Sequence, residues 1–75
     1  MKTTEVNKEL IGRRCECIFT GLMVTGVIED TEENEQTKEV KVRFDRPHQW
    51  GDDLYNDVWA WGRKIDEFGT LRHLQ

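Results

Sequence analysis

The sequence predicts an all-β protein, built mainly from five short antiparallel strands that close into a small barrel. Three observations lead to this fold class. Several short segments alternate apolar and polar side chains with the period of a half-buried strand. No segment of helical length has the periodicity of an amphipathic helix. The chain has only 75 residues, so a sheet that encloses a core must curl strongly.

Residues 1–10 are predicted to form an N-terminal arm, and residues 11–75 the barrel, within a single domain. In the arm, Thr3 or Thr4 is a candidate N-cap for a short helical turn that runs to Leu10. A helix of one or two turns is only weakly stable by itself. The strands are therefore expected to determine the fold.

Five strands are predicted in the rest of the chain. The most regular one covers residues 39–45, where Val40, Val42 and Phe44 alternate with charged side chains and are expected to face the core. The strand before it carries Gly26, which suits a bend or a close approach of two backbones. The other segments with a strand-like composition are residues 13–20, 24–30, 58–65 and 70–74.

Three connections are expected between these strands. The acidic run of residues 29–35 holds five carboxylates and no base, and is expected to form a hairpin loop. Residues 66–69 suit a tight turn, because a glycine there can take a positive φ. Residues 46–57 make a connection longer than most, and it contains a proline, a glycine and aromatic residues. Since function concentrates on loops, this segment is the expected recognition loop.

Three motifs resemble those of the small SH3-like barrels of the Tudor and KOW type. They are Ile11-Gly12-Arg13-Arg14-Cys15-Glu16-Cys17, Thr25-Gly26-Val27-Ile28 and Val40-Lys41-Val42-Arg43-Phe44-Asp45. The resemblance covers residues 11–74 and implies a five-stranded SH3-like barrel that acts as a binding module. Members of this group bind proteins, RNA or DNA, and no particular ligand carries over to this chain.

Composition predicts a cytoplasmic protein with no membrane partner. No apolar run approaches the length of about 20 residues that a membrane span requires. The polar residues 1–9 do not resemble a secretory signal. Cys15 and Cys17 are too close along one strand to form an unstrained disulfide, so reduced thiols are expected.

Catalysis, metals and cofactors are not expected. Cys15, Cys17, His48 and His73 are residue types that bind zinc, but the C-x-C spacing does not match structural zinc sites. The favoured alternative is that both thiols pack as small apolar side chains. The acidic segments lack the spacing of a calcium loop, and the chain contains no serine nucleophile. The prediction is a non-enzyme.

An aromatic cluster is the leading candidate for a binding surface. Aromatic side chains contribute strongly to protein interfaces, so the predicted partner is another protein and the predicted function is that of a small accessory regulator. If Val58 and Ala60 face the core, Trp59 and Trp61 face solvent. A small core needs large side chains, however, and this favours an inward position for at least one of the two tryptophans. The candidate residues are Trp50, Tyr55, Trp59 and Trp61, with Asp52 and Asp53 to attract a basic partner.

Two alternative partners remain open. A basic stripe on the sheet would suit nucleic acid, although a net charge of −4 disfavours it and the cations can instead pair with glutamates on neighbouring strands. In the second alternative, residues 29–35 imitate nucleic acid and bind a basic protein. The sequence does not determine the oligomeric state. The stripe consists of Arg13, Arg14, Lys41, Arg43 and Arg46.

Overall fold

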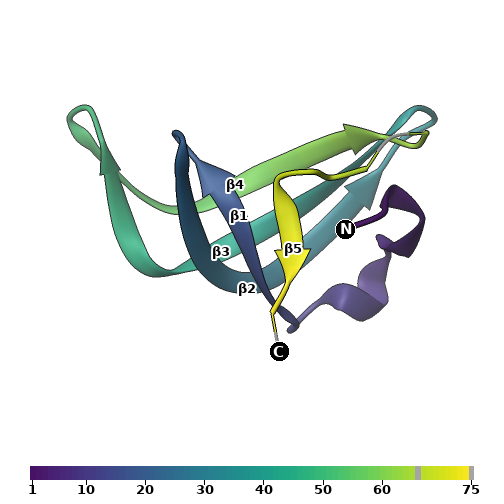
Figure 1. Ribbon diagram of the computed structural model, residues 1–75, viewed down its shortest axis with the longest axis horizontal. Helices are drawn as coiled ribbons and strands as arrows, with labels where there is room; N and C mark the ends of the chain where they lie inside the picture. Colours follow the sequence, from purple (N-terminus) through teal and green to yellow (C-terminus); the bar gives the residue numbers. More distant parts are fainter. Residues whose placement is uncertain (66, 75) are drawn as a thin grey trace.

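The computed structural model describes residues 1–65 and 67–74, and these residues form one five-stranded antiparallel sheet. The order of the strands across the sheet is β4-β3-β2-β1-β5 (Figure 1). The all-β class and the five-stranded antiparallel arrangement are therefore confirmed. The strands are β1 (Arg14–Phe19), β2 (Leu22–Glu33), β3 (Thr37–Trp50), β4 (Asp53–Arg63) and β5 (Leu71–His73).

The sheet is strongly bent but open. β4 and β5 form its two edges, and no ladder joins these strands within the described part of the chain (Figure 1). The closed barrel expected from the sequence is therefore not observed. The pairing is irregular between Ile28 and Asp30 of β2 and between Arg43 and His48 of β3. Extra residues at such positions bend a strand and increase its twist, which accounts for the curvature.

The expected recognition loop of residues 46–57 is instead the end of a long hairpin. Only Gly51 and Asp52 lie outside β3 and β4, and Gly51 has the positive φ, 63°, that this turn requires. We call residues 46–57 the hairpin arm, because this part of the hairpin projects beyond the other strands (Figure 1). The turn between β1 and β2 also contains only two residues, Thr20 and Gly21. Both have a positive φ, as a tight hairpin turn requires.

The acidic run of residues 29–35 is also mostly strand. β2 continues to Glu33, so only residues 34–36 connect it to β3. Asn34 fixes this connection, because its Oδ1 accepts hydrogen bonds of 2.8 Å from two backbone N–H groups of the turn. Two acidic residues of the run lie opposite bases of β3, Asp30 opposite Lys41 and Glu33 opposite Lys38, whereas Glu32 lies opposite Glu39.

The hydrophobic core lies on the inner face of the bent sheet. Val40, Val42 and Phe44 are buried there, as predicted, with exposed fractions of 0%, 0% and 7%. Cys15 and Cys17 are also buried, and both are free thiols, as expected. The remaining buried apolar residues are Val6, Leu10, Val24, Ile28, Phe68 and Leu71.

Phe68 is a core residue that the sequence analysis missed. The predicted turn of residues 66–69 includes Asp66, which lies outside the described residues, but Phe68 itself is 2% exposed. Its backbone N–H donates to the carbonyl of Met1 at 2.9 Å. A Cβ atom at Gly62 would lie 3.5 Å from its ring. Phe68 thus places a large apolar side chain against the inner face of β4.

Gly26 allows β2 and β3 to approach each other closely. It lies opposite Phe44 in the ladder. A Cβ atom at this position would be only 2.2 Å from the carbonyl oxygen of Arg43, so no other residue fits without a shift of the backbone. The close approach expected from the sequence is confirmed.

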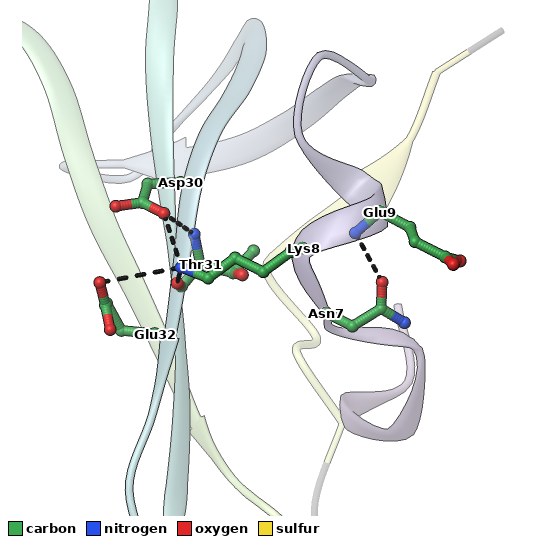
Figure 2. Close-up of polar contacts among 6 residues, drawn as sticks. All are labelled: Asn7, Lys8, Glu9, Asp30, Thr31 and Glu32. Atoms are coloured by element: carbon green, nitrogen blue, oxygen red, sulfur yellow. Dashed lines mark hydrogen bonds and ion pairs between the residues drawn. The ribbon is translucent and has the colours of Figure 1, made fainter.

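The N-terminal segment packs on the sheet through two short 3₁₀ turns, Thr3–Glu5 and Lys8–Leu10. The predicted threonine cap is wrong. Asn7 caps the second turn, because its side chain accepts a hydrogen bond of 2.8 Å from the N–H of Glu9 (Figure 2). Asparagine at this position satisfies a donor that the turn leaves without a partner.

Lys8 joins this segment to β2. Its Nζ lies 2.9 Å from Oδ1 of Asp30 and donates to the carbonyl oxygen of Thr31 (Figure 2). The hydrogen bond to Asp30 raises the pKa of Lys8, and the hydrogen bond from Lys8 lowers the pKa of Asp30. These contacts hold the segment in place while Val6 and Leu10 contribute to the core.

Candidate functional site

The structure separates the predicted aromatic cluster into three places. Trp59 and Trp61 lie on the outer face of β4, with 41% and 66% of their surface exposed. The residues that alternate with them, Val58 and Ala60, pack against the core. The expectation that at least one of these tryptophans fills the core is therefore wrong.

Tyr55 belongs to a different cluster, at the base of the hairpin arm. Its ring centroid lies 5.4 Å from that of Phe19, which in turn lies 5.1 Å from Phe44. The ring of His48 meets Phe44 edge to face at 5.2 Å. These contacts extend the core into the arm. Tyr55 thus attaches the arm to the rest of the sheet and does not adjoin the outer tryptophans.

Trp50 lies at the tip of the hairpin arm, directly opposite Asp53. Its side chain is 58% exposed. Asp52 and Asp53 share this tip, so they accompany Trp50 only. Asp53 and Trp59 are six positions apart along β4, or about 20 Å in an extended strand, so the tip and the outer tryptophans cannot contact one small epitope together.

The outer tryptophans lie in a ladder of charged residues. Trp59 is opposite Lys41, and Trp61 is opposite Glu39. The Nζ atom of Lys41 lies 3.4 Å from Glu29 Oε1 and 3.9 Å from Asp57 Oδ2. The outer face of the β3–β4 hairpin therefore presents two large apolar rings that are bordered by charges of both signs. We call Glu39, Lys41, Asp57, Trp59 and Trp61 the outer face.

The basic stripe is largely neutralised. Arg14 donates two hydrogen bonds to the carboxylate of Asp45, at 3.1 and 2.6 Å. The bond from Arg14 is the main reason that the pKa of Asp45 is lowered. The Nε atom of Arg43 lies 3.5 Å from Glu29, the same carboxylate that pairs with Lys41.

The two remaining members of the stripe are separate from this network. Arg13 and Arg46 make no ion pair within residues 1–65 and 67–74. Arg13 precedes β1, whereas Arg46 lies in the hairpin arm beside a shallow depression that Asp45 and His48 also line. The structure does not bring the five cations together as one uncompensated surface.

The two cysteines are buried in the core, and this burial suppresses ionisation of their thiols. Burial raises the pKa of Cys15 to about 12, and it also raises the pKa of Cys17. Both thiols are therefore protonated at neutral pH, whereas nucleophilic attack and metal binding require the thiolate. Within the described part of the chain, no three His, Cys, Asp or Glu side chains are grouped as metal ligands would be.

A second exposed apolar group lies at the turn between β1 and β2. Ile18 and Met23 are directly opposite each other on the two strands, and both are exposed, as is Leu22. This apolar group was not among the candidate sites that the sequence suggested. The pattern Thr20-Gly21 is a hairpin signal that could have placed the two side chains together.

The fold and the outer face define a small antiparallel β-sheet protein with an exposed aromatic surface. Among the described residues, no helix is both long and apolar enough to cross a membrane. The chain belongs to a family described as a domain of unknown function, DUF7258, whose model matches residues 1–75. No curated protein and no solved structure matches this chain.

Proposed function

We propose that this protein is a non-catalytic protein-binding module, and that its contact surface is the outer face of the β3–β4 hairpin. The observation that carries this proposal is the outward position of Trp59 and Trp61, 41% and 66% exposed on the same side of one strand. Alternate residues of a strand lie about 7 Å apart, so the two rings form a continuous apolar surface.

The energetics of association favour this surface. A tryptophan can bury about 150–250 Å² and loses few rotamers on binding, which is why this residue type is frequent at the energetic centre of interfaces. The charges of Glu39, Lys41 and Asp57 border the rings, in the way that a polar rim surrounds the apolar centre of an interface. The expected partner is a protein with an apolar segment between charged residues.

A protein partner fits this surface better than nucleic acid does. Lys41, which lies opposite Trp59, and its neighbour Arg43 on β3 already share the carboxylate of Glu29. A phosphate group would have to compete with that carboxylate, and an overall charge of −4 opposes its approach. A regulator that acts by binding to another protein needs only the exposed tryptophan rings and the charged residues that border them.

The proposal is tested by affinity capture from native lysate, with and without nuclease. We expect a specific partner that survives nuclease treatment and is lost in the double variant Trp59→Ala, Trp61→Ala. Ile65→Ala is the matched control, because this side chain is 85% exposed and lies outside β4, and it should retain the partner. Retention of the partner by the tryptophan variant would contradict the proposal, as would its loss on nuclease treatment.

A further inference from the structure

β4 is an edge strand with one unpaired side. It contains 11 residues and pairs with β3, and no strand of the described chain pairs with its other side. The opposite edge of the sheet, β5, has only three residues. A long edge leaves a row of backbone N–H and C=O groups that can pair with another strand. Folded proteins commonly cover or shorten such an edge. The unpaired side of β4 is long, so pairing with a strand of another molecule is expected.

The regular part of β4 has a self-complementary outer row. Pairing with β3 is uninterrupted from Thr37 opposite Arg63 to Arg43 opposite Asp57. The alternate residues of this part, which share one side, are an acid, two tryptophans and a base. They are Asp57, Trp59, Trp61 and Arg63. Read in the opposite direction, the row presents the complementary charge at each end and an aromatic residue at each central position.

We propose that two copies of this chain associate through antiparallel pairing of residues 57–63 of β4. A two-fold axis at Ala60 places Asp57 opposite the partner's Arg63 and Trp59 opposite the partner's Trp61. Each of these pairs occurs twice by symmetry, which gives two ion pairs and two aromatic pairs on one face. Opposite charges and aromatic rings directly across a ladder stabilise the pairing of strands.

The inner row of the same segment is compatible with this register. Val58 lies opposite the partner's Gly62, and Ala60 lies opposite its own copy. These small side chains can meet without a steric conflict, whereas the tryptophan rings of both copies remain on the outer side. The result is one continuous sheet of ten strands that carries four neighbouring tryptophans.

Other registers lose these matches. A shift of two residues in either direction removes both ion pairs, because each Asp57 then lies opposite Trp61 or Ile65 of the other copy. A shift of one residue places outer residues of one copy opposite inner residues of the other. Only the register centred on Ala60 satisfies the charges and the rings together.

This association goes beyond the proposed function, because it joins the backbone edge of β4 to a second copy, although it also uses Asp57, Trp59 and Trp61 of the outer face. The two can be tested separately. The oligomeric state tests the edge, and capture of a partner tests the face. A monomeric protein that still captures its partner would overturn the association alone.

Sedimentation equilibrium tests the proposal through charge reversal. Wild-type protein should give a dimer of the 8.9 kDa chain. Asp57→Arg and Arg63→Asp should each self-associate at least about tenfold more weakly, because like charges then face each other at both ends of the row. An equimolar mixture of the two variants restores opposite charges at both ends, so we expect a heterodimer. Circular dichroism of each variant verifies the fold.

Monomeric wild-type protein at high concentration would overturn the proposal, as would a mixture that stays monomeric although both variants are folded. A second measurement uses Ala60→Cys, which places one thiol next to its own copy on the axis and should form an intermolecular disulfide under mild oxidation. The two native thiols are buried and do not compete. Ile65→Cys, which is more exposed but distant from the axis, is the control. Equal cross-linking of both variants would also contradict the proposed register.

Discussion

β3 and β4 have similar alternating sequences, but they place their large side chains on opposite sides of the sheet. In β3, the large apolar residue Phe44 faces the core together with Val40 and Val42. In β4, the small residues Val58 and Ala60 face the core and the tryptophans face outward. Hydrophobicity alone therefore does not decide which side of a strand is buried.

The difference follows from what else occupies the interior. On the inner side of β3, the strand's own side chains, Val40, Val42 and Phe44, fill the interior. Below β4, the ring of Phe68 already fills it and lies against Gly62. Interiors are densely packed, so a strand next to a large inserted ring must present small residues to it. The outer tryptophans are then available for contacts with other molecules.

The largest effect is expected from Phe44→Ala. This change removes a buried ring that also contacts Phe19 and His48, so it should lower the free energy of unfolding by about 3–5 kcal/mol. A loss of that size could unfold a domain this small. Urea denaturation measures it. A loss below about 1 kcal/mol would show that the interior of β3 is not close-packed.

The next largest effect is expected from Gly26→Ala. Its added methyl group would lie 2.2 Å from the carbonyl oxygen of Arg43, so β2 and β3 must separate locally. Overpacking of this kind costs about 1–3 kcal/mol, and the rigid backbone places this site at the upper end. Gly21→Ala distinguishes steric conflict from conformational strain, because Gly21 has open space around it and only its φ of 85° opposes a side chain. Thermal denaturation should show a lower midpoint for Gly26→Ala than for wild type, and an unchanged midpoint would contradict the close approach.

The sequence was sufficient to predict the strands and the inner row of β3. It was sufficient because Val40, Val42 and Phe44 alternate with charged residues, which leaves one choice of face. The length of the strands was underestimated. Pro47 suggested a loop, but it lies in the irregular part of β3 between Arg43 and His48, where the ladder requires no N–H from it.

The candidate site was only partly predictable. Tyr55, in the expected loop, is close in sequence to Trp59 on the expected strand, so both were assigned to one aromatic cluster. The irregular pairing of β3 bends the hairpin between them, and Tyr55 turns toward Phe19 instead. The orientation of Trp59 and Trp61 depended on Phe68, which lies against Gly62 on the inner side of the same strand but belongs to a segment whose burial has no periodic signal. Long-range packing of this kind is not encoded in a local pattern.

A smaller effect is expected where β1 and β3 are joined by an ion pair. Hydrogen bonds from Arg14 and Thr25 lower the pKa of Asp45 below its ordinary value of 3.8. Because the folded pKa is the lower one, this carboxylate stabilises the protein above pH 3.8, and the contribution is lost as the pH falls through the lowered pKa. Asp45→Asn should therefore lower the thermal midpoint at neutral pH, and the difference from wild type should shrink in acid. Asp52→Asn at the hairpin tip is the control, and an Asp45→Asn difference that grew in acid would contradict the assignment.

The smallest change in the free energy of unfolding is expected from Trp61→Ala, although this change removes the largest side chain. It tests most directly whether β3 and β4 bury opposite kinds of side chain. Trp61→Ala removes a ring that is 66% exposed, so the free energy of unfolding should change by less than about 0.5 kcal/mol. Val58→Ala removes far fewer atoms, but they pack against the core, so this change should cost about 1–2 kcal/mol. Both values are measured by urea denaturation at concentrations where the chain is monomeric. If Trp61→Ala lowers the free energy of unfolding more than Val58→Ala does, the Trp61 ring stabilises the fold. The outer tryptophans would then not be available mainly for binding.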